Sequence, residues 1–137
     1  MTNAKRKLVV LAIFGVVGLA GLAAHAGSKF DSYTVSTESY GGGAGSMQGN
    51  LAAARNSSDY SQHIGCQVSG YAGSPSTVAC FGCTAANVCG YCSSAAPELV
   101  QLASSITSEA SVSFTWDGSG TCKSLSVNNQ SSYGPKH

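Results

Sequence analysis

Six cysteines constrain this 137-residue chain more than any other feature. They are Cys66, Cys80, Cys83, Cys89, Cys92 and Cys122. In an oxidising compartment such residues pair as disulfides, each of which stabilises a small domain by roughly 2–4 kcal/mol. In a reducing compartment the same residues are more typical of metal sites or of redox catalysis. The compartment therefore decides how the cysteines are interpreted.

The N-terminus has the pattern of a secretory signal peptide. Basic residues 5–7 precede an apolar stretch over residues 8–24, and Ala24, His25 and Ala26 form a small-x-small cleavage site. We expect residues 1–26 to be removed and residues 27–137 to fold as one disulfide-rich α+β domain. The sequence thus predicts a secreted or periplasmic protein.

The mature chain is short of charge. It keeps four basic and six acidic residues, a net charge of −2, because three of the seven positive charges lie in the leader. No basic patch remains to bind phosphates or an anionic membrane surface. We therefore expect no nucleic-acid partner and no membrane association after cleavage. Serine, glycine and alanine are abundant and bury little area each, so disulfides are expected to substitute for a large core.

Hydrophobic patterning predicts a small antiparallel sheet of about five strands with two helices, an α+β fold. Residues 41–45 are rich in glycine and are interpreted as a flexible joint, and residues 82–95 are expected to be irregular. Strands are predicted over residues 30–40, 62–71, 77–81, 111–116 and 121–127, and helices over about 46–55 and 96–107.

The last predicted strand contains a conflict. In a regular strand only one alternate set of side chains faces the core. The two sets are Cys122, Ser124 and Ser126, or Lys123, Leu125 and Val127. The second set is more apolar, whereas Cys122 needs a buried partner, so only a bulge or a two-sided sheet would satisfy both.

Structural disulfides are the leading interpretation of the cysteines. One pair would close a short loop, one would cross the predicted hairpin, and one would tie the second helix to the last hairpin. In that order the hypothesis pairs Cys83 with Cys89, Cys66 with Cys80, and Cys92 with Cys122.

Metal binding is a weaker interpretation of the same residues. The four central cysteines form a C-x2-C-x5-C-x2-C pattern that resembles a zinc site. The spacer is much shorter than the roughly 15–20 residues of common zinc ribbons. Oxidation also competes for the thiolates, so we expect no metal and no cofactor.

Redox catalysis is the remaining alternative. The tetrapeptide Cys89-Gly90-Tyr91-Cys92 resembles the active site of thioredoxin-fold disulfide isomerases, in which the first cysteine is the nucleophile and the second the resolving thiol. In that family an apolar strand leads into the motif and a helix begins at it. Here neither element is predicted at the required position.

Other candidate sites have ordinary explanations. His63 follows Asp59 by four residues, but no G-x-S-x-G motif accompanies them. Tyrosines could form a sugar-binding or adhesive face, because each has a flat apolar body and a polar tip, but ordinary half-buried positions in strands and loops are the favoured interpretation. The tyrosines are Tyr33, Tyr40, Tyr60, Tyr71, Tyr91 and Tyr133.

Two segments resemble small exported bacterial proteins of unassigned function. Residues 54–66 read Ala-Arg-Asn-Ser-Ser-Asp-Tyr-Ser-Gln-His-Ile-Gly-Cys, and residues 114–122 read Phe-Thr-Trp-Asp-Gly-Ser-Gly-Thr-Cys. The resemblance implies an exported bacterial protein and assigns no activity. Cys83 and Cys89 are additional to that pattern, which fits a local staple.

These observations favour a non-catalytic binding or surface-interaction module held by disulfides, with a protein or a glycan as its partner. The sequence does not identify the binding residues. One alternative is a thiol–disulfide oxidoreductase that uses Cys89 and Cys92. Another is a subunit of a surface fibre, in which the strand near Tyr33 is donated to a neighbour across the glycine joint.

Overall fold

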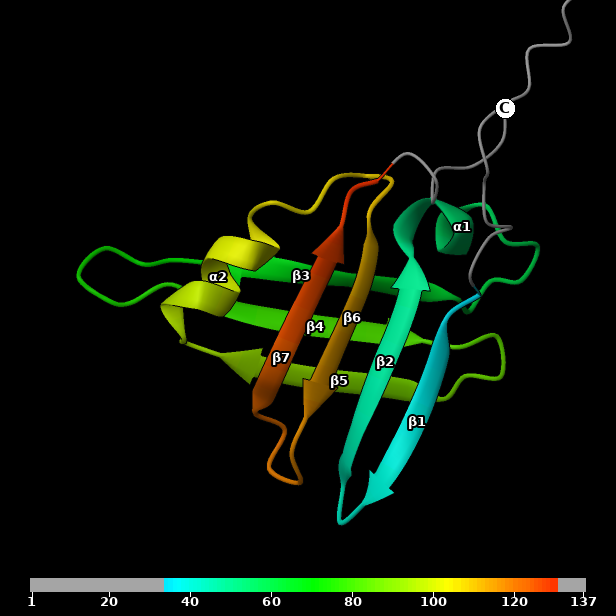
Figure 1. The fold of residues 1–137 in the computed structure, drawn as a ribbon, viewed down its shortest axis with the longest axis horizontal. Coiled ribbons are helices and arrows are strands. Elements are labelled where there is room, and N and C mark those ends of the chain that lie inside the picture. The colour runs from blue at the N-terminus through cyan, green and yellow to red at the C-terminus, as the bar shows by residue number, and fades with distance from the viewer. Residues whose placement is uncertain (1–33, 131–137) are drawn as a thin grey trace, which may run out of the picture.

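The structure is a computed structural model that describes residues 34–130. Seven strands and two short helices make up this part of the chain (Figure 1). The strands are β1 (Ser36–Gly41), β2 (Ala44–Asn50), β3 (His63–Ser69), β4 (Thr77–Cys83), β5 (Cys89–Ser94), β6 (Ser111–Trp116) and β7 (Cys122–Asn128). The helices are α1 (Leu51–Arg55) and α2 (Pro97–Ala103). The predicted signal peptide lies outside the described residues.

The strands form two antiparallel sheets, in the orders β1-β2-β6-β7 and β3-β4-β5. Figure 1 shows one sheet stacked on the other, with their strands crossing steeply. Such crossed packing buries the inner faces of both sheets against each other. The predicted class of antiparallel strands, two helices and disulfides is therefore right, but the single sheet of about five strands is wrong.

The strand count is higher because β2 and β5 were not predicted. The segment of β2 was expected to begin a helix, yet only α1 is helical, with Asn50 as its N-cap. Residues 82–95, expected to be irregular, contain all of β5. The glycine segment is not a flexible joint but the turn of the β1–β2 hairpin. Positive φ angles at Gly41, Gly42 and Gly43 suit this turn, because glycine adopts them without steric cost.

Inward-facing glycines make room for two large side chains. A Cβ atom added at Gly45 in β2 would lie 2.7 Å from Cζ2 of Trp116, and one added at Gly90 in β5 would lie 2.5 Å from its Cη2. The indole ring is therefore held between the two sheets. In the same way, a Cβ at Gly82 would lie 2.6 Å from Sδ of the fully buried Met47. The thin core depends on these close approaches.

A bulge in β7 resolves the conflict over its inward face. The β6–β7 register shifts between Thr115 and Trp116, which makes Lys123 an extra residue on β7. The bulge turns both Cys122 and Leu125 into the core, where each is buried. Neither regular alternation describes the whole strand.

Three disulfides join the strands in the same pairs that the sequence hypothesis favoured. Two lie within the three-stranded sheet, and the third links β5 to β7 and so ties the two sheets together. The pairs are Cys66–Cys80, Cys83–Cys89 and Cys92–Cys122. The third bridge was expected to reach from the second helix, but β5 supplies its first cysteine.

Helix α2 follows β5 and confirms the predicted second helix, although it ends at Ala103 rather than near residue 107. Pro97 occupies its first turn, where its missing N–H needs no partner. Leu99 and Ala103 are buried, and the helix packs against β7 and β4. It covers the ends of strands from both sheets (Figure 1).

Candidate binding groove

The structure does not bring Cys89 and Cys92 together. They lie on opposite faces of β5, because residues three apart on a strand point in opposite directions. Cys89 is exposed and bonded to Cys83, whereas Cys92 is fully buried and bonded to Cys122. All six cysteines are paired. The arrangement therefore offers neither a nucleophilic thiolate nor a resolving thiol.

Asp59 and His63 also have separate partners. The Asp59 carboxylate accepts hydrogen bonds from the backbone N–H groups of Ser61 and Gln62 and from the Gln62 side chain. The Gln62 side-chain bond, followed by its backbone bond, holds the pKa of Asp59 well below its usual range. His63 Nδ1 lies 2.9 Å from the Ser61 carbonyl, and its ring packs near Phe81. Nothing in residues 34–130 points to catalysis, and no metal-binding cluster is found among them.

The tyrosines do not form one face. The four described ones are all exposed: Tyr40, Tyr60, Tyr71 and Tyr91. Tyr60 lies in the α1–β3 connection and Tyr71 in the β3–β4 connection, which are at opposite ends of the molecule (Figure 1). Tyr33 and Tyr133 lie outside the described residues.

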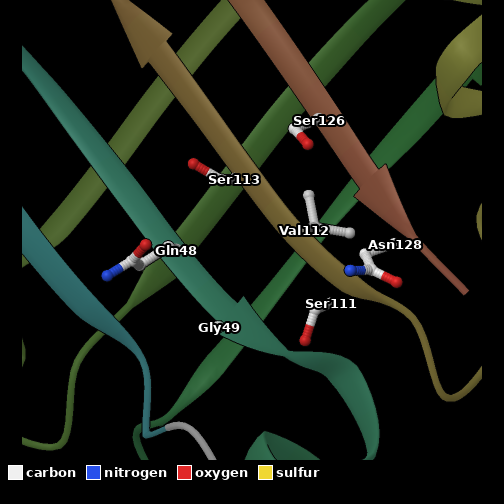
Figure 2. A pocket seen from close by; sticks show the side chains of 7 residues that line it. All are labelled: Gln48, Gly49, Ser111, Val112, Ser113, Ser126 and Asn128. Carbon is white, nitrogen blue, oxygen red and sulfur yellow. The ribbon is translucent and has the colours of Figure 1, made fainter. Parts of the chain in front are cut away.

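Short polar side chains cover the outer face of the four-stranded sheet. The strand register aligns them in rows across the sheet, of which Ser36, Gln48, Ser113 and Ser126 form one and Glu38, Ser46, Thr115 and Ser124 another. A shallow hollow of about 250 Å³ lies on this face, between Gln48, Ser111, Ser126 and Asn128 (Figure 2). The hydroxyl of Ser111 is buried there without a hydrogen-bond partner.

This polar face is explained by hydration. Its hydroxyls bond to each other, as between Thr115 Oγ1 and Ser124 Oγ at 2.8 Å, and no aromatic ring lines the hollow of Figure 2. Protein interfaces are usually depleted in serine and enriched in aromatic residues. In a chain with few charges, such a face keeps the sheet surface wetted.

A second hollow, of about 310 Å³, lies between β1 and the beginning of β5. Its lining is different in kind, because it includes Val88, Tyr91 and Trp116 beside the β1 residues Thr37, Glu38 and Ser39. We call this hollow the edge groove. Two strand edges and three apolar side chains therefore meet at one place.

Trp116 is fixed firmly at the edge groove. Its ring is held between Gly45 and Gly90, and its Nε1 donates a hydrogen bond of 2.9 Å to the carbonyl oxygen of Gly43. Phe114 packs beside it with ring centroids 5.7 Å apart. A ring positioned in this way is ready for contact without a loss of side-chain freedom on binding.

The other two apolar residues of the edge groove, Val88 and Tyr91, are exposed and lie next to a disulfide in the chain. Val88 is 51% exposed and Tyr91 57% exposed, and Cys89, which is bonded to Cys83, lies between them in the sequence. Phe81, 39% exposed, is directly opposite Tyr91 in the register of β4 and β5. The exposed apolar surface thus extends from the groove onto the outer face of the three-stranded sheet.

Sequence reasoning did not find the edge groove. Its walls are β1, β2, β5 and Trp116 at the end of β6, and of these strands β2 and β5 were not predicted. The available signal was Val88 and Tyr91, two apolar residues on either side of Cys89. Only the structure shows that both are exposed.

Comparisons with protein-family models, with curated proteins and with solved structures give no match to this chain. Neither α1 nor α2 has the length and apolar content needed to cross a membrane.

Proposed function

We propose that the chain is an exported, non-catalytic binding module that recognises a macromolecular partner at the edge groove. The observation that carries this proposal is the exposure of Val88 and Tyr91 beside the fixed ring of Trp116. Exposed apolar side chains gathered around a hollow are typical of interaction sites rather than of an idle surface.

The disulfides support an oxidising location. Three bridges within fewer than a hundred described residues are unusual in a reducing compartment. Together with the signal-peptide pattern and the resemblance to exported bacterial proteins, they favour a secreted or periplasmic protein. In this role the bridges keep the groove rigid without a large core.

The chain contains a single tryptophan, which makes its fluorescence a direct reporter of the edge groove. Purified protein would be titrated with a panel of peptides and a panel of neutral and acidic oligosaccharides while Trp116 emission is followed. We expect a saturable change with at least one member of the panels.

Two tyrosine variants provide the specificity test. Tyr91→Ser removes a groove side chain and is expected to weaken binding at least tenfold, whereas Tyr71→Ser removes an even more exposed ring at a distant connection and is expected to leave binding unchanged. Binding that is insensitive to Tyr91→Ser, or that leaves Trp116 emission unaltered, would place the binding surface elsewhere and refute the proposal.

A further inference from the structure

The outer edge of β1 is an open strand edge. Among residues 34–130, no bridge and no backbone hydrogen bond joins this edge to another element. The other edges are better covered: β7 packs against α2, α1 packs against β3, and β5 is bridged near its end through Ser93 and Thr121. Natural sheets protect a free edge with charged side chains, proline or bulges. In β1 the one charged residue is Glu38 and the bulge lies at Tyr40, next to the hairpin turn, so residues 36–39 keep a regular open edge.

From this edge we propose that the partner of the edge groove is an extended peptide segment that adds as a strand to β1. Its inward side chains are apolar, and a basic side chain faces Glu38. The inference rests on the proposed function and specifies the partner class. Strand addition of this kind obtains affinity from main-chain hydrogen bonds and specificity from alternate side chains.

The register of β1 places an added strand over the groove. Thr37 and Ser39 pair with the inward-facing residues Met47 and Gly45, so they lie on the inner side of β1. Both also line the edge groove, and both are small. A strand hydrogen-bonded to the outer edge would lie about 4.8 Å from β1, and its inward side chains would enter the hollow.

The walls of the groove favour apolar side chains at those inward positions. Val88, Tyr91 and Trp116 are the large apolar residues that line the hollow, and burying apolar surface here against an apolar side chain removes it from water. A polar side chain at the same position would lose its hydration without a matching partner.

The negative charge of Glu38 indicates which residue the added strand should carry on its outward-facing side. Glu38 is the one charged residue among those lining the groove, and in the described residues the one ion pair joins Lys123 to Asp117. Five acidic and only two basic residues are described, so the surroundings attract a cation. Opposite charges directly across two strands stabilise their pairing.

A peptide fits the open edge better than a glycan does. The edge offers N–H and C=O groups that repeat every second residue, and a second strand presents the same repeat. Sugar hydroxyls have no such period. A glycan is therefore treated as a competing outcome of the test.

The experiment uses a blocked peptide of the length of β1, in which valine or phenylalanine alternates with lysine and threonine. Binding to the intact protein with its disulfides formed is followed by Trp116 emission. Two further peptides carry N-methyl groups at either the odd or the even positions. In a strand pairing, only one of the two sets of N–H groups faces the partner strand.

We expect one N-methylated peptide to lose at least tenfold in affinity and the other to bind within about threefold of the parent, since each lost bond also leaves a carbonyl without its partner. Glu38→Lys is expected to weaken binding of the lysine peptide and to favour a matched peptide with glutamate in place of lysine. Glu98→Lys, in the first turn of α2, is the control and is expected to change neither.

Several outcomes would overturn the inference. Equal binding of both N-methylated peptides means that side chains alone hold the peptide, and the proposed function stands. Binding of an oligosaccharide at Trp116 with no peptide binding replaces the partner class, and the function again stands. A dimer in light scattering that Glu38→Lys disrupts means that a second copy occupies the edge. A silent Trp116 in every titration removes both proposals.

Discussion

Gly90→Ala is the most direct test of how the two sheets pack. The new Cβ atom would lie 2.5 Å from Cη2 of Trp116, and the ring cannot retreat, because a Cβ-sized space is also missing at Gly45 on its other side. Forcing an added methyl group into such a core typically costs about 1–3 kcal/mol. Replacing glycine by alanine also restricts the unfolded chain, which stabilises the folded state by about 0.4–1 kcal/mol. We expect a net loss of about 1–2 kcal/mol.

Gly65→Ala is the matched control. Gly65 lies in β3 of the same sheet, and a Cβ atom added there meets nothing within 4 Å. The unfolded-state gain is common to both variants, so the difference between them isolates the cost of over-packing, about 1–3 kcal/mol.

The measurement is equilibrium urea unfolding with the disulfides intact, followed by circular dichroism and by Trp116 emission. With a typical urea dependence of about 1–3 kcal/mol per molar, the two midpoints should differ by about 1 M. In a Trp116→Leu background, followed by circular dichroism, Gly90→Ala should cost much less than in the parent, because the shorter side chain no longer meets the new methyl group. Equal midpoints for Gly90→Ala and Gly65→Ala would refute the packing of Trp116 between the sheets.

Three further predictions concern other parts of the fold. Replacing both Cys92 and Cys122 by alanine opens a 30-residue loop and should lower the free energy of unfolding by roughly 3–4 kcal/mol; a urea midpoint like that of the parent would contradict a role for this bridge. The ion pair with Lys123 holds the pKa of Asp117 well below its usual range, so its contribution to stability is complete above the unfolded-state pKa of about 3.9 and is lost as the pH falls towards the folded-state pKa. Acid titration of Asp117→Asn should therefore show a shallower fall in stability below about pH 4 than the parent shows. Asn50→Ala removes a buried N-cap and a bond to a distant carbonyl, and should destabilise by about 2–3 kcal/mol in thermal unfolding, where an unchanged midpoint would count against both bonds.

Local patterns predicted the elements whose residues have a strong preference of their own. The hairpin of β3 and β4 and the strand β6 alternate in the expected way, and Pro97 marks the start of α2. Strand β7 was predicted in place, but the bulge at Lys123 interrupts its alternation. The turn after β6 was also evident from its Asp-Gly sequence. These segments carry β-branched or aromatic residues, or a helical repeat of leucine and valine, so their structure follows from short-range preferences.

Strands β2 and β5 carry no such preference. Their inward positions include Gly45, Gly49 and Gly90, which by themselves favour a turn or a bulge over a strand. They become strands because Trp116 and Val35 occupy the space above these glycines. The same reason hid the edge groove, because these two strands form part of its walls.

The sequence by itself determined the cysteine content, the leader pattern, the scarcity of charge and the positions of two hairpins, because each of these is written in neighbouring residues. Tertiary structure alone decided that there are two crossed sheets, that Lys123 is a bulge, and that Val88 and Tyr91 lie beside Trp116 at an open edge. The physical reason is that a glycine has little preference for a strand by itself, and it is accommodated in one where another side chain fills the space beside it. That side chain comes from a distant part of the chain.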